Sequence, residues 1–505
     1  MAAKFEANRP QSPMQASGAW PRTDVDVDTW QEAAEHLASG TWTLFGLWGD
    51  VAAVHLAALC QDRGSRILTL TCIDGEFPSI SARHPPAARL ERAIHDLFGH
   101  KPVGALDARG WLDHGRWDVR YPLSPTATPA EATAVTYPFL PVKGPGLHQI
   151  PVGPVHAGII EPGHFRFTAN GETVVRLEER LGYVHKGVEG LMAKSDLDRG
   201  ARLSGRVSGD STVAYAYAFA RAAEAACSIE PPARAIWLRA LMAELERLAN
   251  HFGDIGAICN DASFALMHAH CGMLRERVLR ASDLCFGHRL MRDFIVPGGV
   301  VIDLTHDGSE TLRGLARHIK ATFPELVELY DNTASLQDRT VGAGVLTSKL
   351  ARQYGCGGYV GRASGREFDV RRILPYEPYP RLQFEVPVRT EGDVDARVRV
   401  RMKEVEQSVL ILEQILDRLP ASDLRTQIPA GAGGFREGTA VVEGFRGDIL
   451  VWLRLDPAGK ISRCHLRDPS WFQWPVLEAA IEGNIVADFP LCNKSFNCSY
   501  SGHDL

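Results

Sequence analysis

The residues best suited to metal chemistry in this sequence are its ten cysteines, which are spread along the chain from Cys60 to Cys498. No two of them form a Cys-x-x-Cys pair, the local spacing that zinc ribbons and ferredoxin-type clusters use. The sequence therefore predicts no metal site built from neighbouring cysteines. We expect buried, reduced thiols of a cytoplasmic protein, and we expect any iron–sulfur centre to lie on another chain.

Two further patterns could carry chemistry, and both favour a structural interpretation. The segment His268-Ala-His270-Cys271 resembles a metal-binding tract, but residues two apart on a helix point to different faces, so a shared ion is not expected. The glycine clusters at 355–358 and 431–434 lack the spacing of a Rossmann or Walker phosphate loop. We therefore expect turns at both clusters.

Composition limits the class of protein that could position such residues. The chain has 505 residues, of which 45% are apolar and 23% are charged, and at this length two or more domains are expected. A net charge of -6 argues against an autonomous nucleic-acid binder, which carries a basic excess. No apolar run reaches about 18 residues, and the N-terminus lacks the apolar core of a secretory signal. A role at a membrane would therefore come through partner subunits.

Pro-rich segments divide the chain into a smaller and a larger part. Residues 1–25 are rich in Pro, Ser and Ala, and we predict that they are disordered. Residues 124–146 are dense in Pro, Thr and Ala and are the predicted linker. The smaller part, residues 26–123, contains a strand pattern and a helix pattern, at Ile67–Ile73 and near Arg89–Phe98.

The larger part, residues 147–505, is predicted to be mostly helical. It opens with strand-like sequence around an Asn170-Gly171 hairpin turn. One helix is expected to start at Pro231-Pro232 and another to run from about Asp393 to Leu419, and strand-like alternation returns near Thr439–Leu455. The predicted fold class is α+β, with a small N-terminal α/β domain followed by a larger helix-rich domain.

Two groups of motifs carry a family resemblance. Glu91-Arg-Ala-Ile-His-Asp-Leu-Phe-Gly99 and Gly115-Arg-Trp-Asp-Val-Arg-Tyr-Pro122 are similar to the ERExxDxFG helix and the closing GHPLRKDYP of the 30 kDa (C-type) subunit of complex I. The larger part resembles the 49 kDa (D-type) subunit of complex I and, equally, the large subunit of group 4 membrane-bound nickel–iron hydrogenases. The segments that carry this second resemblance are Gly153–His156, Leu181–Glu189, Glu244–His251, Pro297–Gly299 and Pro375–Tyr379.

This resemblance to a fused C/D subunit of NADH-quinone oxidoreductase implies both a fold and partners. Residues 26–123 would form the C-like (30 kDa type) domain, and residues 147–505 would form the D-like (49 kDa type) domain, of the hydrogenase large-subunit type. Its implied partners are a small iron–sulfur subunit with a [4Fe–4S] cluster and integral membrane subunits, with no nucleic acid. Quinone or a nickel–iron centre would lie between the large and small subunits. NAD(H), quinone and the cluster would belong to the complex, which would be peripheral on the inner, cytoplasmic face of the cell membrane.

The residues that would bind nickel and iron are absent from the matching motifs. Such a centre needs four soft thiolates, which the hydrogenases supply as RxCGxC and DPCxxC. The first motif reads Arg206-Val-Ser208-Gly-Asp-Ser211 here, and the second places Ser499 and Gly502 at its cysteine positions. Cys498 falls one position early. We therefore expect no nickel–iron chemistry.

The quinone-reducing residues of complex I are only partly present. Quinone reduction needs proton donors, which the family supplies as a histidine of an HPAAH loop and a tyrosine. By the resemblance, His156 matches the first histidine of that loop, but the proton-donating histidine falls on Ile160 and the tyrosine on Arg206. Asp261 matches the aspartate that orients the missing histidine.

Several polar residues of the implied cavity nevertheless remain, and each has a structural alternative. His156 either lines the cavity or packs in its loop, Asp261 either lines it or caps a turn, and Tyr215 either lines it or is a core aromatic. Glu161 matches a hydrogenase carboxylate at a magnesium site, but we expect it to form an ion pair instead, and we predict that Arg206 pairs with Glu161, Asp210, Asp261 or Asp504. The full set of candidate site residues is His156, Glu161, Arg206, Ser208, Asp210, Ser211, Tyr215, Asp261 and Asp504.

Two functional hypotheses follow from these motifs. In the first, the chain is a core peripheral-arm oxidoreductase subunit of a complex I-like or hydrogenase-like membrane complex, acting in electron transfer from NAD(P)H or another donor toward quinone. In the second, it is a non-catalytic coupling scaffold that has lost both the nickel–iron and the quinone chemistry. The missing ligands favour the second hypothesis more than any family name does.

Overall fold

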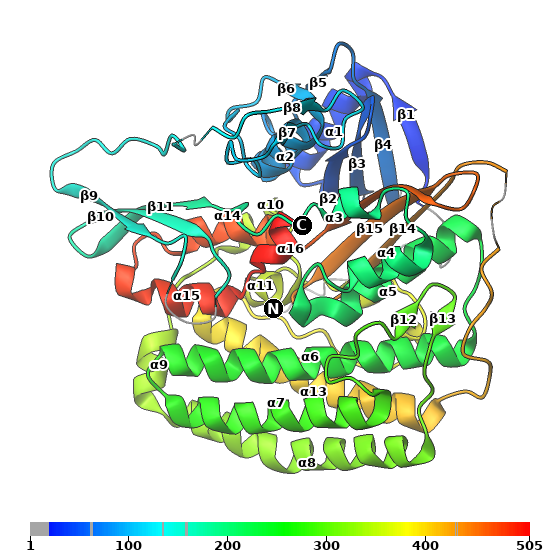
Figure 1. Ribbon diagram of the computed structural model, residues 1–505. Coiled ribbons are helices and arrows are strands. Elements are labelled where there is room, and N and C mark those ends of the chain that lie inside the picture. Colours follow the sequence, from blue (N-terminus) through cyan, green and yellow to red (C-terminus); the bar gives the residue numbers. More distant parts are fainter. Residues whose placement is uncertain (1–19, 61–63, 134–135, 157–159, 430, 432) are drawn as a thin grey trace, which may run out of the picture.

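The computed structural model describes residues 20–60, 64–133, 136–156, 160–429, 431 and 433–505 (Figure 1). Its N-terminal unit contains β1 (Arg22–Val25), α1 (Val27–Ser39), β2 (Trp42–Gly49), β3 (Ala53–Cys60), β4 (Gly64–Thr71), β5 (Glu76–Pro78), a 3-10 turn (Pro85–Ala87), α2 (Ala88–Phe98), β6 (Lys101–Val103), β7 (Val119–Arg120) and β8 (Thr128–Pro129). Its main sheet has the order β1-β4-β3-β2, in which only the β1–β4 pair is parallel.

The first strand corrects the prediction that residues 1–25 are all disordered. Arg22–Val25 pairs with β4, beginning at Arg22 opposite Ile67, and Pro21 accepts a hydrogen bond from the Ile67 amide. The polar, Pro-rich composition that suggested disorder therefore includes a short edge strand whose stability comes from backbone pairing. Residues 1–19 lie outside the described part of the chain.

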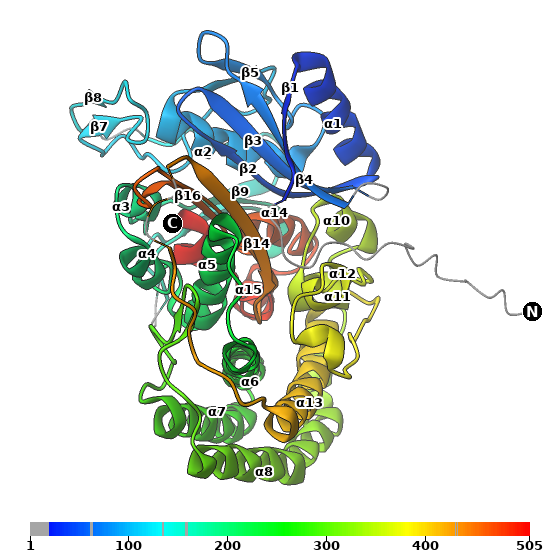
Figure 2. The same ribbon diagram turned by 90° about the vertical axis from the view of Figure 1, so that its right-hand side faces the viewer.

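The N-terminal sheet is buried on both faces. Side chains alternate along its strands, so successive residues enter different cores. Leu56 and Leu68 belong to a core shared with α1 and α2. Ala57 and Ile67, one position along, belong instead to the core of the C-terminal part. Trp48 of β2 and Trp452 confirm this contact, since their ring centroids lie 5.5 Å apart. The two parts of the chain are thus packed directly on one another (Figures 1 and 2).

The C-terminal part is larger and mostly helical, as the sequence predicted. Its elements are β9 (Leu147–Val152), β10 (His164–Asn170), β11 (Thr173–Arg180), α3 (Val188–Met192), α4 (Leu197–Ser204), η2 (Gly209–Ser211), α5 (Thr212–Cys227), α6 (Ala233–Asp261), α7 (Ala265–Phe286), β12 (Ile295–Val296), β13 (Gly299–Val300), α8 (His306–Asp331), α9 (Ala334–Thr340), α10 (Ser348–Gln353), α11 (Gly358–Ala363), α12 (Val370–Ile373), η3 (Tyr379–Arg381), α13 (Val394–Arg418), β14 (Arg436–Glu443), β15 (Asp448–Leu455), β16 (Ile461–Arg467), α14 (Ser470–Ala480), η4 (Val486–Asp488), α15 (Phe489–Phe496) and α16 (Tyr500–Asp504).

These elements form layers. Helices α6, α7, α8 and α13 pack side by side, and α5 lies between this helical layer and the sheet β14-β15-β16 (Figure 1). The other face of that sheet meets the N-terminal sheet. The arrangement places α5 between the sheet and the helical layer, with η2 directly before it in the chain.

The main local predictions for this part are confirmed. Helix α6 begins directly after Pro231-Pro232, where the missing amide hydrogens of proline cost nothing. Helix α13 begins after Asp393, whose side chain accepts a hydrogen bond from the Ala396 amide at 2.7 Å. Strands β10 and β11 are joined at Asn170-Gly171, with Gly171 at a φ of 59°.

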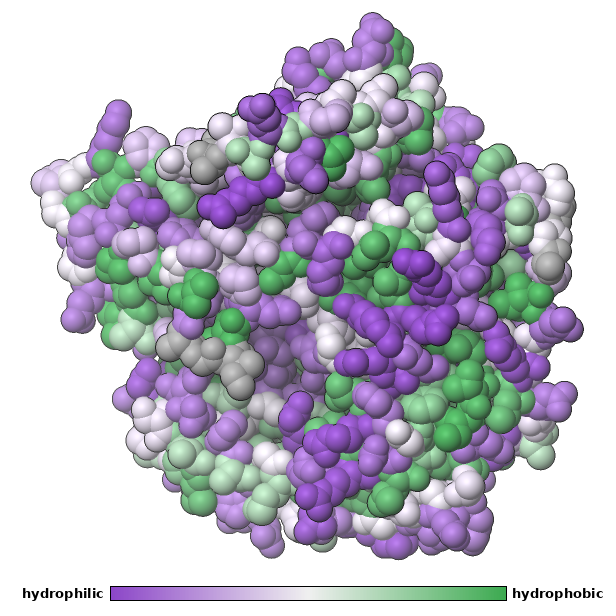
Figure 3. All heavy atoms as spheres, viewed as in Figure 1, coloured by the Kyte–Doolittle hydropathy of each residue, from purple (hydrophilic) through white to green (hydrophobic). Residues whose placement is uncertain are grey.

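The segment 124–146 runs between the two parts without a helix among its described residues, and its β8 pairs with β7. The proposed division into residues 26–123 and 147–505 remains a prediction. In the part of the chain that the structure describes, no helix is both long and apolar enough to cross a membrane. Figure 3 shows hydrophilic and hydrophobic residues interspersed over one face of the molecule.

A buried network of charges holds the helices and the central sheet together. The Arg362 side chain of α11 is fully buried and contacts Glu404 at 2.6 Å, Glu443 at 2.9 Å and Asp369 at 3.5 Å. Burial alone would lower the pKa of Arg362, but these carboxylates raise it above its ordinary value. The network continues through Asp369–Arg371 at 2.7 Å, Arg371–Glu244 at 3.0 Å, Glu244–Arg247 at 3.2 Å and His251–Glu404 at 2.7 Å.

We predict that Arg362→Met lowers the free energy of unfolding by roughly 3–5 kcal/mol, because it leaves several carboxylates buried without their shared cation. Arg313→Met is the control, since Arg313 pairs with Asp417 at 2.6 Å on the surface and should cost no more than about 1 kcal/mol. Urea unfolding followed by tryptophan fluorescence measures both. Equal, small losses would contradict the importance of the network.

Candidate functional site

Two serines distant in sequence meet at the start of α16. Ser208 directly precedes η2, Ser499 caps α16, and their Oγ atoms lie 2.9 Å apart. Both residues are buried. They occupy two positions at which the resemblance places metal-binding cysteines.

The hydrogen bonds around these serines have a single consistent direction. The Ser208 hydroxyl donates to Asp210 Oδ1 at 2.7 Å, so its oxygen accepts from the Ser499 hydroxyl. The Ser499 oxygen in turn accepts from the Gly502 amide at 2.8 Å. A directed chain of hydrogen bonds therefore runs from the first turn of α16 to the carboxylate of Asp210.

Arg446 completes this chain electrostatically. Its Nη2 lies 2.6 Å from Asp210 Oδ2, and its Nη1 donates to Ser211 Oγ at 3.2 Å. Burial would raise the pKa of Asp210, but Arg446, together with hydrogen bonds from Ser208 and Ser211, lowers it to about 2. The Arg446 side chain is 3% exposed and that of Asp210 is 37% exposed, so the cluster reaches the surface at Asp210.

Asp468 fills the space where the fourth cysteine side chain would lie. A Cβ atom built on Gly502 would overlap Asp468 Oδ2. That carboxylate is fixed in place, since it accepts from the Tyr215 hydroxyl at 2.7 Å and from the Ser470 amide at 2.9 Å. A larger residue at 502 would therefore have to displace a buried, hydrogen-bonded carboxylate.

These residues do not fit a nickel–iron centre. The four positions offer three hydroxyls and one glycine, whereas such a centre needs four thiolates. A hydroxyl is a hard, weakly acidic donor. Carboxylates and a guanidinium also occupy the interior of the site, and they already satisfy one another. We therefore derive no reaction through such a centre for this chain.

Glu161 and Asp504 anchor the same C-terminal segment rather than joining the serine cluster. Glu161 Oε2 accepts from the Ser501 amide at 2.9 Å. Asp504 is fully buried, and its carboxylate accepts from the Val184 amide at 3.1 Å and from His503 Nδ1 at 2.8 Å. Both carboxylates thus act on α16, and so indirectly position Ser499.

His156 lies in the loop after β9, with its ring centroid 5.5 Å from that of Phe165. Neither of its ring nitrogens has a hydrogen-bond partner in the described residues, and the adjacent residues 157–159 lie outside them. Tyr215 is a buried aromatic of α5 whose hydroxyl also belongs to the site, through Asp468. Tyr215 is thus a core aromatic, and its role at the site stays a prediction.

The prediction for Arg206 is wrong. Its guanidinium is 42% exposed and pairs at 2.6 Å with Asp293, a residue that none of the sequence motifs singled out. No ion pair joins it to Glu161, Asp210, Asp261 or Asp504, all of which the structure describes.

Asp261 is the last residue of α6 and is exposed. Asn250 of the same helix donates a hydrogen bond to the Asp210 carbonyl. Asp261 lies eleven residues further along the helix, a distance of about 16 Å.

Sequence reasoning missed Arg446, the cation of the site, and Asp468. Ser499 was recognised as a lost cysteine but was not named as a site residue. The doublet Phe445-Arg446 lies between β14 and β15 and carries no motif. The sequence did indicate that a cation is needed, because carboxylates left without a metal require a new partner. The cation beside Asp210 is Arg446 and not Arg206.

The fold and the site together define a large subunit of the type shared by complex I and the group 4 hydrogenases, with polar residues in place of the metal ligands. Comparison with known proteins agrees. The family described as "Respiratory-chain NADH dehydrogenase, 49 Kd subunit" matches residues 263–433. Formate hydrogenlyase subunit 5 of Escherichia coli (strain K12) is 33% identical over 516 residues, covering 96% of this chain and 90% of the relative.

Two other proteins extend the comparison. The fused C/D subunit of NADH-quinone oxidoreductase from Phocaeicola vulgatus is 28% identical over 403 residues, covering 75% of this chain and 77% of the relative. A chain of the membrane-bound sulfane sulfur reductase, an archaeal respiratory membrane complex, matches with a TM-score of 0.67 and 28% identity, covering 71% of this chain and 99% of the other. This chain therefore belongs to the family of complex I 49 kDa subunits and group 4 hydrogenase large subunits, as the motifs indicated.

We predict that Arg446→Met lowers the free energy of unfolding by about 1–3 kcal/mol, because it leaves Asp210 without its cation. The value lies below that for a fully buried pair because Asp210 is partly solvated. Arg206→Met is the matched control and should cost at most about 1 kcal/mol, as expected for an exposed pair. Denaturant unfolding of both variants tests this, and an equal or larger loss for Arg206→Met would contradict the role given to Arg446.

The lowered pKa of Asp210 predicts a pH dependence. A carboxylate whose pKa is lower in the folded than in the unfolded state stabilises the fold above its unfolded pKa and loses that effect as the pH falls. The stability difference between the native protein and Asp210→Asn should thus be largest above about pH 4 and should shrink toward pH 2. Urea unfolding at several pH values measures it. If the stability difference did not change with pH, the charge of Asp210 would not contribute to the stability of the folded protein.

Proposed function

We propose that this chain is a core peripheral-arm subunit of a complex I-like or hydrogenase-like membrane complex, acting in electron transfer from NAD(P)H or another donor toward quinone, with no nickel–iron centre of its own. The observation that carries the proposal is the Ser208–Ser499 contact at 2.9 Å. It joins the two distant segments that, by the resemblance, would carry the family's cysteines, and it places hydroxyls where thiolates would lie. Hydrogen activation is thereby removed while the architecture of the arm is kept.

The relatives support the electron-transfer setting, since one of them is a subunit of an NADH-quinone oxidoreductase. By the family pattern, a small iron–sulfur subunit would bring its cluster to the face where Asp210 reaches the surface, and integral membrane subunits would hold the arm at the inner, cytoplasmic side of the membrane. Ile160 and Arg206 stand at the positions of the family's proton donors and both are exposed, so any quinone protonation in this complex would use other residues.

The second candidate function is a coupling scaffold without redox chemistry at this site. The specific observation in its favour is that the serine cluster is closed by its own hydrogen bonds, ending on the Asp210–Arg446 pair. In this case the chain would transmit movement between the iron–sulfur partner and the membrane subunits, and the buried network around Arg362 would make it stiff enough to do so.

Metal analysis of the complex purified with its partners tests the main proposal. We predict no stoichiometric nickel and no hydrogen uptake or evolution, with NAD(P)H-dependent or other donor-dependent quinone reduction retained. The triple variant Ser208→Cys, Ser211→Cys, Ser499→Cys should still acquire no nickel, because Asp468 occupies the space beside Gly502. Stoichiometric nickel in the native complex would overturn the proposal.

A single substitution separates the two candidate functions. Ser208→Ala removes the hydroxyl that bonds to both Ser499 and Asp210 but creates no buried charge. If an acceptor reacts at this cluster, the variant complex should assemble normally and lose its quinone-reducing activity by about tenfold or more. If the cluster is only a scaffold, activity per assembled complex should stay unchanged.

A further inference from the structure

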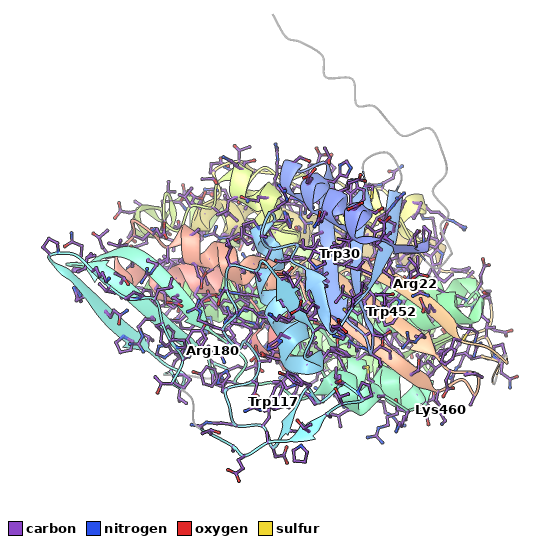
Figure 4. The ribbon with its side chains drawn as sticks, turned by 90° about the horizontal axis from the view of Figure 1, so that it is seen from above. Arg22, Trp30, Trp117, Arg180, Trp452 and Lys460 are labelled. Atoms are coloured by element: carbon purple, nitrogen blue, oxygen red, sulfur yellow. The ribbon has the colours of Figure 1, made fainter. Side chains whose placement is uncertain are left out.

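A cluster of three charged side chains joins the N-terminal unit to the C-terminal part. Arg89 belongs to α2, Glu179 to β11 and Glu478 to α14. Arg89 Nη1 lies 3.0 Å from Glu179 Oε2, and its Nη2 lies 2.8 Å from Glu478 Oε1. Figure 4 labels Arg180, the residue after Glu179, between the β9–β11 sheet and the N-terminal unit. The junction on this side therefore passes through one shared guanidinium.

Arg89 cannot neutralise both carboxylates. It donates one N–H to each of them, and its guanidinium carbon lies 4.6 Å from the centroid of the Trp111 ring. The side chains of Arg89 and Glu179 are 10% and 0% exposed, whereas that of Glu478 is 26% exposed. Glu478 Oε1 also accepts from the Glu179 amide at 2.8 Å, but no group within the described residues hydrogen-bonds to Glu179 Oε1. One carboxylate charge is thus in excess.

The groups around this cluster, in the part of the chain that the structure describes, supply no unpaired cation. The titratable or charged groups that face the cluster from neighbouring segments are Arg92, Glu178, Tyr354, Cys498, Tyr500 and His503. Arg92 pairs with Asp107 at 3.0 Å, and Glu178 pairs with Arg109 at 2.6 Å. Burial raises the pKa of the two tyrosines and of the cysteine and lowers the pKa of the histidine, so all four are uncharged at neutral pH.

Two carboxyls that share one cation in a buried site retain a proton more readily than either would alone. Burial, followed by the charge of Glu478, raises the pKa of Glu179 well above its ordinary value, and Arg89 only partly opposes this rise. Burial also raises the pKa of Glu478, although Arg89 lowers it. The pair therefore holds a proton at a pH at which an isolated glutamate has lost it.

Two other contacts across the junction lack this excess of charge. Trp48 and Trp452 meet through apolar rings. Asp50 pairs with Arg454 at 2.5 Å, and although burial would raise the pKa of Asp50, hydrogen bonds from His55 and Arg454 lower it far below its ordinary value. This pair stays charged throughout the neutral range. A change of pH should therefore act on the α2 side of the junction.

We propose that Arg89, Glu179 and Glu478 form a pH-sensitive clamp, in which the two carboxyls share one proton while α2 is docked on β11 and α14. Loss of this proton to water, through the partly exposed Glu478, weakens the contact. Because the docked state binds the extra proton, its stabilising effect is complete below the pKa of about 4.3 of a glutamate in an unfolded chain, and it is lost as the pH rises through the higher value of the docked pair. The clamp is independent of the reaction assigned to the complex.

Hydrogen exchange of the full chain, followed by mass spectrometry from about pH 5 to about pH 9, measures the clamp locally. Dividing each rate by the intrinsic exchange rate at the same pH gives the protection of α2. We expect this protection to fall as the pH rises, by up to about tenfold per pH unit, which is the limit for one proton. Helix α7, in the helical layer away from the junction (Figure 1), is the internal reference and should keep constant protection.

Glu478→Gln is the decisive variant. Its amide oxygen still accepts from Arg89 and from the Glu179 amide, but the excess charge is gone. Protection of α2 should then be independent of pH and, near pH 9, exceed that of the native chain by about tenfold or more. Glu179→Gln should likewise abolish the pH dependence, and it carries the test if the first variant fails to fold. Glu76→Gln is the matched control, since Glu76 forms an exposed pair with Lys101 at 3.0 Å on the same unit, and it should keep the native profile.

Three results would overturn the clamp. Protection of α2 that does not change with pH in the native chain would show that both carboxyls stay ionised in the docked state. A pH dependence that survives in both glutamine variants would assign the proton to another group. An equal loss of protection in α7 would mean that the whole fold, rather than the junction, responds to pH.

Discussion

The contact on which the C-terminal fold depends is that of Arg362 with three buried carboxylates. Charges taken out of water are tolerated only when each has close partners. The partners here come from α13, from β14 and from the residue before α12, so separating these elements would break buried ion pairs at Arg362. The long helices pack through apolar stripes, but their register relative to the sheet is set by these ion pairs.

The serine cluster shows how a metal site can lose its metal and keep its geometry. Ser208 and Ser499 still bring together two segments 291 residues apart, with hydrogen bonds where thiolates would share metal ions. The charge that a metal would have supplied comes from Arg446. Under the proposed function, such a replacement would let a chain similar to hydrogenases over nearly its whole length serve a complex with different chemistry.

Local features of the fold could be predicted from the sequence, whereas long-range pairing could not. The start of α13 at Asp393 follows from capping, and the hairpin at Gly171 follows from turn chemistry; both depend on neighbouring residues. The loss of thiolates at 208 and 211 was equally visible, because motif positions are read directly. The partner of Asp210 was not, since Arg446 lies 236 residues away in a connection without a motif. Arg206 matches the motif arginine and is the only cation among the predicted site residues, but it is partly exposed and pairs with Asp293.

The direct stacking of the two sheets has a consequence for assembly. Trp48 and Trp452 form part of an extensive apolar contact, and Arg22 pairs with Glu437 across it at 3.2 Å. When such halves are separate polypeptides, their association depends on the amount of each that is made. Because one chain carries both sheets, their docking is intramolecular, at an effective concentration set by the connecting chain rather than by expression. The fusion thus fixes a one-to-one stoichiometry and protects each half from being produced without its counterpart.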